Sequence, residues 1–325
     1  ENAHWFRSNP AKAATDYFQT IPAAKITASY YEDVSLPKVM VASGVIYDKA
    51  SAGNGGWYEG DMRENTGKST FSVGINMANY GVTSASMASQ AQPQAIQTAT
   101  IHHARGVYAN GTMPHGYSGG NSILTLDNSV GNEFSHEIGH HYGLGHYPGQ
   151  SGDNYFWAAH HHDSGWGFIG YRKRMRANIY WNAINGGGCD MKGVPRLDAT
   201  YCFNTDSMSG GHYNSALSNY AHYTGYSTKL KIQPALAKPV LNPASPTGYS
   251  QWNASTRQME NVAPKLVNQS AVWNNTKTGV YMAPRQTGVP VITLLGGYDP
   301  DNASAVMYPA LRGNWGNVVD PPSAA

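Results

Sequence analysis

The eleven residues from His136 to His146 constrain this chain more than any other segment. They read H-E-I-G-H-H-Y-G-L-G-H, which fits the pattern H-E-x-x-H-x-x-G-x-x-H. Residues four apart on an α-helix lie on the same face. His136 and His140 can therefore present two imidazole nitrogens to one zinc ion at about 2.0–2.1 Å. The segment predicts a helix that holds a metal.

Three further positions complete the expected site. Glu137 is offset by roughly 100° around the helix axis, so its carboxylate flanks the metal and can take a proton from water. Gly143 tolerates the left-handed conformation that ends many helices, and the turn there brings His146 back as a third ligand. Three protein ligands leave one tetrahedral position open, which is typical of catalytic zinc. A helix that is merely rich in histidine is the alternative.

Length and composition restrict the class of protein. The chain has 325 residues, enough for one large domain or two. A formal net charge of +2 does not favour a nucleic-acid partner, and no apolar run is long enough to span a membrane. The first residues contain neither a methionine nor the apolar core of a signal peptide, which indicates a processed form or an excised domain. The low charged fraction, 13%, is typical of many secreted proteins.

Local patterns give a first division into elements. β-branched and aromatic residues bounded by Gly and Pro predict strands, and a stretch that ends before Pro234 and Pro239 could be helical. Asn128 or Ser129 is expected to cap the metal-binding helix. The predicted strands are 37–47, 98–108, 122–126 and part of 290–318; the predicted helical stretches are 171–183 and 212–236; residues 239–250 read as a linker or a loop.

Two longer segments resemble one protein family. Residues 116–147 (GYSGGNSILTLDNSVGNEFSHEIGHHYGLGHY) closely resemble the catalytic segment of the StcE-like secreted bacterial metalloproteases, the TagA and dictomallein group of the metzincin clan. Residues 289–319 (VPVITLLGGYDPDNASAVMYPALRGNWGNVV) resemble the end of the same catalytic domain. Because both segments occur in the family's order, the resemblance is more specific than the zinc motif alone.

The resemblance implies an α+β fold of the zincin type. We expect a twisted mixed β-sheet with an active-site helix, followed by an irregular C-terminal subdomain. A single metzincin-like catalytic domain is expected over residues 1–325, with an N-terminal subdomain at 1–146 and a C-terminal subdomain with a Met-turn at 147–325. In such folds the strand before the active-site helix, here 122–126, lies at the sheet edge, where substrate adds by main-chain pairing.

The resemblance also implies a function. It assigns His136, His140 and His146 as ligands of one zinc ion and Glu137 as the catalytic base of a secreted endopeptidase. The implied substrates are mucin-type O-glycosylated proteins, cleaved outside the bacterial cell in a role linked to virulence, and a monomer is expected. A general secreted metzincin protease without a glycan requirement is one alternative. A glycan-binding adhesin that retains zinc as a scaffold is another, and the intact Glu137 argues against it.

Metzincins place a methionine in a tight turn beneath the zinc. Met208 is the best candidate, because Asp206 to Gly211 is a run of small and turn-forming residues. Met191 is the second candidate, and ordinary core packing is the alternative for either. Tyr213 follows the turn and could reach the oxyanion of the reaction, although a buried tyrosine satisfied by backbone groups is the simpler interpretation.

Substrate contacts are expected elsewhere in the chain. Trp57 and Tyr58 lie in a glycine-rich stretch with few neighbours to bury them, and exposed aromatic rings stack on the apolar faces of sugars. The alternative is a loop that these rings anchor in the core. His115 precedes the predicted strand closely enough to contact substrate. His160–His162 with Asp163 could hold a second cation, although a solvated loop is the simpler interpretation.

Cys189 and Cys202 are the only cysteines. In an oxidising compartment they would close a small loop, which stabilises a fold by about 3 kcal/mol in the chain-entropy model. Two free thiols in a cytosolic protein are the alternative. The resemblance to secreted proteases favours the disulfide.

Overall fold

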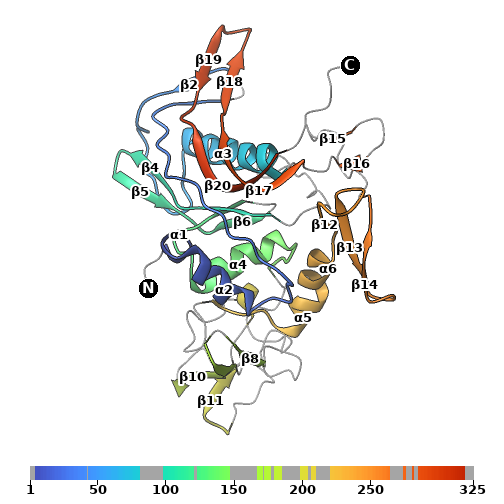
Figure 1. Ribbon diagram of the computed structural model, residues 1–325. Helices are drawn as coiled ribbons and strands as arrows, with labels where there is room; N and C mark the ends of the chain where they lie inside the picture. Colours follow the sequence, from blue (N-terminus) through green and yellow to red (C-terminus); the bar gives the residue numbers. More distant parts are fainter. Residues whose placement is uncertain are drawn as a thin grey trace. The chain divides into compact units, whose positions relative to one another are not determined.

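A computed structural model describes most of the chain, and helices and small sheets alternate through it (Figure 1). This mixture confirms the expected α+β class. The described residues are 4–41, 43–80, 98–120, 123–146, 167–170, 172–176, 179–184, 198–203, 206–209, 220–263, 274–275, 280–281 and 285–318.

The chain divides into two compact units that interleave along the sequence. The first unit comprises Glu1–Ala28 and Asn128–Leu236, and the second comprises Ser29–Asp127 and Ala237–Ala325. The subdomain boundary expected at residue 146 falls inside the first unit. A single catalytic domain of the metzincin type stays a prediction.

The first unit contains the predicted metal-binding helix. Its elements are α1 (Trp5–Ser8), α2 (Pro10–Phe18), α4 (Gly131–His141), β8 (Gly167–Ile169), β9 (Arg174–Arg176), β10 (Ile179–Ile184), β11 (Tyr201–Phe203), the 3-10 helix η2 (Ser207–Ser209), α5 (Gly225–Ser227), the π-helical turn η3 (Thr228–Ile232) and α6 (Gln233–Leu236).

Helix α4 begins differently from the sequence expectation. Val130 is its extended N-cap residue and makes no side-chain cap bond, so the expected cap by Asn128 or Ser129 is wrong. Instead the Glu133 carboxylate, in the first turn of the helix, accepts a hydrogen bond at 2.7 Å from the amide of Asn128, two residues before the N-cap. The Ser129 hydroxyl accepts from the Phe6 amide at 3.2 Å, which ties α1 to the start of α4.

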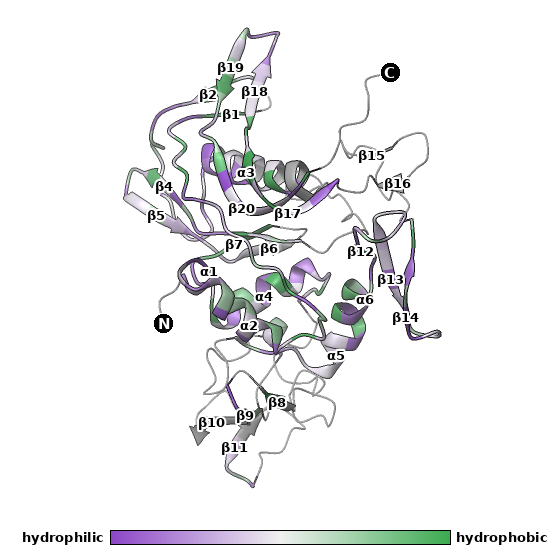
Figure 2. Ribbon diagram, in the orientation of Figure 1, coloured by the Kyte–Doolittle hydropathy of each residue, from purple (hydrophilic) through white to green (hydrophobic). Residues whose placement is uncertain are grey.

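An aromatic cluster forms the buried side of α4. Phe134, which is fully buried, stacks on Phe6 with ring centroids 4.8 Å apart and meets Tyr17 edge-on at 5.0 Å. Tyr220 closes the cluster at 4.9 Å from Phe134. Such geometries add about 0.5–1.5 kcal/mol per pair beyond apolar burial. In Figure 2, α4 carries both hydrophobic and hydrophilic residues, as an amphipathic helix must.

The basic stretch at 171–183 is not helical where it is described. Residues Arg174–Arg176 form β9, which pairs antiparallel with β8, and Ile179–Ile184 form β10. Lys173 has φ +52°, a left-handed turn conformation that interrupts a helix. The predicted helix is therefore wrong. For 212–236 the prediction is confirmed over 225–236 (α5, η3 and α6), while 212–219 lie outside the described residues.

The second unit contains one long helix and most of the strands. Its elements are β1 (Val39–Met40), β2 (Ile46–Tyr47), α3 (Met62–Tyr80), β3 (Thr100–His102), β4 (Ala104–Tyr108), β5 (Gly111–His115), β6 (Ser118–Gly120), β7 (Ile123–Thr125), β12 (Val240–Leu241), β13 (Tyr249–Asn253), β14 (Gln258–Asn261), β15 (Asn274–Asn275), β16 (Val280–Tyr281), β17 (Gln286–Thr293), β18 (Gly296–Asp299), β19 (Ser304–Met307) and β20 (Leu311–Val318).

Helix α3 packs against the antiparallel pair β17–β20 in this unit (Figure 1). Phe71 and Ile75 of the helix join Val39, Val306 and Leu311 in one buried core. The strand texture predicted for 290–318 is confirmed by β17 to β20. Residues 240–241 and 249–253 pair antiparallel, so the stretch 239–250 is part of a small sheet rather than a linker.

The strand that precedes α4 in sequence is central in its sheet. The order is β3-β7-β6, with β3 parallel and β6 antiparallel to β7. The predicted strand at 122–126 is confirmed over Ile123–Thr125, but its expected place at the sheet edge is wrong, because β6 covers it. Among the described residues of this sheet, β6 is the outer strand on that side.

No described helix has both the length and the apolar character needed to cross a membrane.

Candidate metal centre

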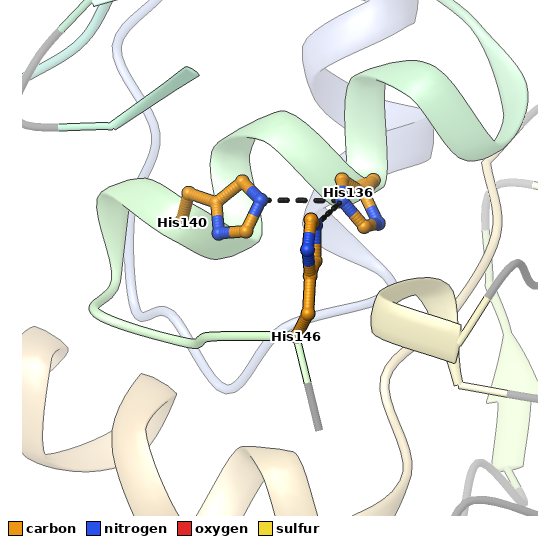
Figure 3. A group of neighbouring side chains, drawn as sticks. All are labelled: His136, His140 and His146. Atoms are coloured by element: carbon orange, nitrogen blue, oxygen red, sulfur yellow. Dashed lines mark hydrogen bonds between the residues drawn. The ribbon is translucent and has the colours of Figure 1, made fainter. Parts of the chain in front are cut away.

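The three histidines of the motif converge on one point (Figure 3). His136 and His140 project from successive turns of α4. After α4, Gly143 takes φ +86°, and this left-handed turn, expected from the sequence, returns His146 to the helix. The Nε2 atoms of His136 and His146 are 2.8 Å apart, and those of His140 and His136 are 3.2 Å apart.

Backbone carbonyls fix the orientation of two of the rings. His136 Nδ1 donates to the Ser207 carbonyl at 2.9 Å, and His140 Nδ1 donates to the Leu144 carbonyl at 2.8 Å. A carbonyl only accepts, so each Nδ1 carries the proton and each Nε2 offers a lone pair to the cluster. Metal-ligating histidines are usually oriented in this way.

The charge state of these rings also suits a metal. Burial lowers the pKa of His136 to about 4, and burial lowers the pKa of His140 as well. Both rings are therefore neutral at pH 7. Two facing lone pairs repel each other unless a proton or a cation lies between them, and the lowered pKa values disfavour the proton. Nitrogens bound to one tetrahedral zinc are about 3.4 Å apart, so the observed spacings fit that ion.

Of the described residues, only these three histidines form a group of at least three His, Cys, Asp or Glu side chains that could share an ion. The second cation considered for His160–His162 and Asp163 falls on residues outside the described part.

Glu137 lies beside this cluster on the same helix. Its side chain is buried, with 5% of its surface exposed. Burial raises the pKa of Glu137 to about 7, and the nearby Glu133 carboxylate acts in the same direction. A carboxylate with a raised pKa is a stronger base than an exposed one, which suits proton transfer near neutral pH.

Met208 lies under the same helix. It belongs to η2, is fully buried, and packs so closely on α4 that a methyl group at Gly139 would overlap its sulfur atom. The role of Met208 in a Met-turn stays a prediction. The sequence did not reveal why position 139 is glycine, since the reason is a contact with a residue distant in the chain.

In the second unit, Trp57 and Tyr58 form an exposed cluster with Tyr117. The exposed fractions of Trp57 and Tyr58 are 45% and 70%. Their ring centroids lie 5.1 Å and 5.4 Å from that of Tyr117, which has φ +54° just before β6. We call these three residues the aromatic surface. Tyr117 was missed at the sequence level, because nothing local indicates that it meets the loop.

Backbone contacts hold the loop that carries this surface. The Asn110 side chain accepts from the Gly55 amide and donates to the Gly55 carbonyl, both at 2.9 Å. The Gly116 amide donates to the Trp57 carbonyl at 3.1 Å. A side chain at Gly55 would overlap the Tyr108 ring, so glycine permits this close approach.

His115 is buried at the end of β5. Its Nδ1 lies 3.4 Å from a Glu64 carboxylate oxygen, and burial together with the charge of Lys68 lowers its pKa. Contact between His115 and substrate stays a prediction, and these contacts fit a residue that supports the loop.

The other predicted residues cannot be placed in the site. Tyr213, Cys189 and the alternative Met191 lie outside the described residues. Cys202 falls on β11, and its predicted disulfide with Cys189 stays a prediction.

The geometry defines a three-histidine metal centre with an adjacent carboxylate, the arrangement of metal-dependent peptidases. Comparison with known proteins agrees. The family described as Peptidase M66 matches residues 5–240, and a domain described as ToxR activated gene A lipoprotein domain matches residues 282–325. The chain belongs to the Peptidase M66 family, which confirms the resemblance seen in the sequence.

Several named relatives align with this chain. The ToxR-activated gene A lipoprotein of Vibrio cholerae is 35% identical over 95% of this chain and 29% of its own length. Metalloprotease StcE of Escherichia coli O157:H7 is 38% identical over 77% of this chain and 28% of its own length. Dictomallein of Burkholderia mallei is 29% identical over 59% of this chain and 28% of its own length. The chain thus spans less than a third of the relatives that it matches.

Proposed function

We propose that this chain is the catalytic domain of a secreted zinc endopeptidase that cleaves mucin-like, O-glycosylated proteins. The observation that carries the peptidase part is the convergence of the His136, His140 and His146 Nε2 atoms beside the buried Glu137. Membership of the Peptidase M66 family supports it.

The mechanism follows from what these residues can do. Zinc, when bound, lowers the pKa of a water molecule and polarises the scissile carbonyl. Glu137 accepts a proton from the attacking water and returns it to the leaving nitrogen, and its raised pKa lets one carboxylate do both near pH 7. The Ser207 and Leu144 carbonyls keep the His136 and His140 rings oriented while Glu137 takes up and returns the proton.

Substrate peptide would bind through its backbone. The strand β6 has its inner side paired with β7, and an extended peptide adding to its outer side would gain main-chain hydrogen bonds without a sequence requirement. The glycines Gly119 and Gly120 in this strand carry no side chain that would obstruct the approach.

The glycan requirement is supported by the aromatic surface. Trp57, Tyr58 and Tyr117 hold three rings together at the surface of the second unit. Aromatic faces pack well against the apolar faces of sugars. The anchoring of the loop through Asn110 means that little ordering entropy is lost on binding. A role outside the cell fits such substrates.

The test is cleavage of one mucin-type glycoprotein, intact and enzymatically stripped of its O-glycans, by the zinc-loaded chain. We expect the intact form to be cut and the stripped form to resist. Trp57→Ala should slow cleavage of the intact form while zinc content stays at one ion per chain. Equal cutting of both forms would reject the glycan requirement and leave a general secreted protease.

A further inference from the structure

Asp206, which the sequence did not single out as functional, is a fully buried carboxylate directly before η2. A buried carboxylate is costly unless it is hydrogen-bonded. Asp206 accepts from the Met208 amide at 2.8 Å, from the Thr224 amide at 2.8 Å and from the Thr224 hydroxyl at 2.9 Å. It therefore connects the turn at 206–209 to the segment that leads into α5.

These bonds fix the residue between them. Ser207 lies inside the turn that the Asp206 to Met208 bond closes, and the Ser207 amide donates to the His222 carbonyl at 3.1 Å. Its carbonyl has little freedom to move, and it accepts from His136 Nδ1 at 2.9 Å. Hydrogen bonds thus join Thr224 to Asp206 and Ser207 to His136, a predicted metal ligand, and the peptide chain links Asp206 directly to Ser207.

We propose that Asp206 is a positioning residue of the metal centre. By fixing the Ser207 carbonyl, it keeps His136 in the tautomer that turns its Nε2 lone pair toward the ion. The inference depends on the proposed function only in that the three histidines bind zinc. Partners that orient metal-ligating histidines typically contribute about 10–100-fold in metal affinity.

The first test is zinc affinity in Asp206→Asn. Asparagine has the same shape, but its amide nitrogen is a donor and cannot accept from both Met208 and Thr224. We expect the dissociation constant for zinc, measured by competition with a chromogenic chelator, to rise about 10–100-fold. The visible spectrum of the cobalt-substituted protein should also change, since it reports ligand geometry.

Asp16→Asn is the matched control. Asp16 is a second buried aspartate in the same unit, and it accepts from Arg172 Nε at 2.9 Å and from a terminal Arg172 nitrogen at 2.7 Å. The same substitution there should lower stability and leave zinc affinity and the cobalt spectrum unchanged. Equal loss of affinity in both variants would mean that Asp206 acts only through general stability, which would overturn the proposal.

A second pair of variants covers the case in which Asp206→Asn does not fold. Thr224→Val removes the hydroxyl donor and keeps the shape, whereas Thr224→Ser keeps the hydroxyl. We expect weaker zinc binding in the valine variant and near wild-type binding in the serine variant. Wild-type affinity in Thr224→Val would contradict the proposal.

The outcomes separate this inference from the proposed function. If the wild-type chain binds zinc but cuts no glycoprotein, the proposed function fails and the affinities still test Asp206. If the wild-type chain cuts its substrate and Asp206→Asn binds zinc normally, only the role of Asp206 fails.

Discussion

Gly139 marks the closest approach between helix α4 and the turn that carries Met208. A helix interior normally disfavours glycine by about 1 kcal/mol relative to alanine, so the helix gives up intrinsic stability at this point. In return, the Met208 sulfur can lie directly against the backbone of the turn that separates His136 from His140. Here the identity of one residue depends on another that is distant in the sequence.

Gly139→Ala should therefore destabilise the protein despite its better helix propensity. The added methyl overlaps Met208, and overpacking of this kind costs about 1–3 kcal/mol. Urea denaturation measures the loss. Gly145→Ala is the control, because a methyl there meets nothing within 4 Å. In the double variant Gly139→Ala with Met208→Ala, the loss should be smaller than the sum of the two single losses, and full additivity would argue against the contact.

Glu137→Gln separates chemistry from metal binding. The amide keeps the shape of the side chain but cannot take the proton from water, so turnover should fall by about 10²–10⁴-fold. Zinc content, measured by atomic absorption, should stay at one ion per chain because Glu137 is not a ligand. Normal cleavage by this variant would rule out Glu137 as the base.

At the scale of elements, α4 and the methionine beneath it could be predicted, whereas the carbonyl of Ser207 that orients His136 could not. The ligand spacing, Glu137 and Gly143 follow from helix geometry and lie within eleven residues. The long helix α3 was missed, because its glycines weaken the helical signal. At Gly67 a methyl group would come within 3.2 Å of the Leu36 side chain and 3.3 Å of the Val39 side chain, so the glycine permits close packing, and packing rather than propensity stabilises α3. Strands β9 and β10 were mistaken for part of a helix, because pairing with other strands overrides local propensity.

Three tyrosine hydroxyls join the elements around α4. The Tyr17 hydroxyl of α2 lies 3.1 Å from the Tyr142 hydroxyl and 3.3 Å from the Tyr223 hydroxyl. The Tyr223 hydroxyl in turn donates to the Ser135 carbonyl at 2.5 Å. All three side chains are buried. The network ties the N-terminal helix and the segment before α5 to the back of the active-site helix.

Tyr17→Phe should lower the free energy of unfolding by about 1–3 kcal/mol, because it removes a hydrogen-bond partner from the buried Tyr142 and Tyr223 hydroxyls. Denaturant melts of the metal-loaded protein measure the change. Tyr298→Phe removes an exposed hydroxyl from the second unit and should change stability by less than about 0.5 kcal/mol. Similar effects in the two variants would show that the network contributes nothing specific.

At the scale of the whole molecule, the two units are each assembled from separate stretches of chain. All three histidines of the candidate metal centre and the described carbonyls that accept from their rings belong to the first unit. The α3 core and the aromatic surface belong to the second. Metal binding should therefore stabilise the two units unequally.

Removing zinc with a chelator should loosen the first unit selectively. Hydrogen exchange should become faster in α4, in η2 and around Thr224, and stay unchanged in α3 and in β17–β20. At free zinc about 1,000 times the dissociation constant, binding stabilises a fold by about 4 kcal/mol, so the loss should be readily measured. Uniform acceleration over both units would contradict this division.

The hydrogen bond from His136 to Ser207 has a consequence for biosynthesis. These residues are 71 positions apart in the sequence, and at about 5–20 residues per second the ribosome needs several seconds to make that stretch. Until Ser207 has emerged, the nascent chain contains all three histidines of the candidate metal centre but lacks the carbonyl that accepts from the His136 ring. The hydrogen bonding of the candidate metal centre is therefore complete only some seconds after its last histidine has been translated.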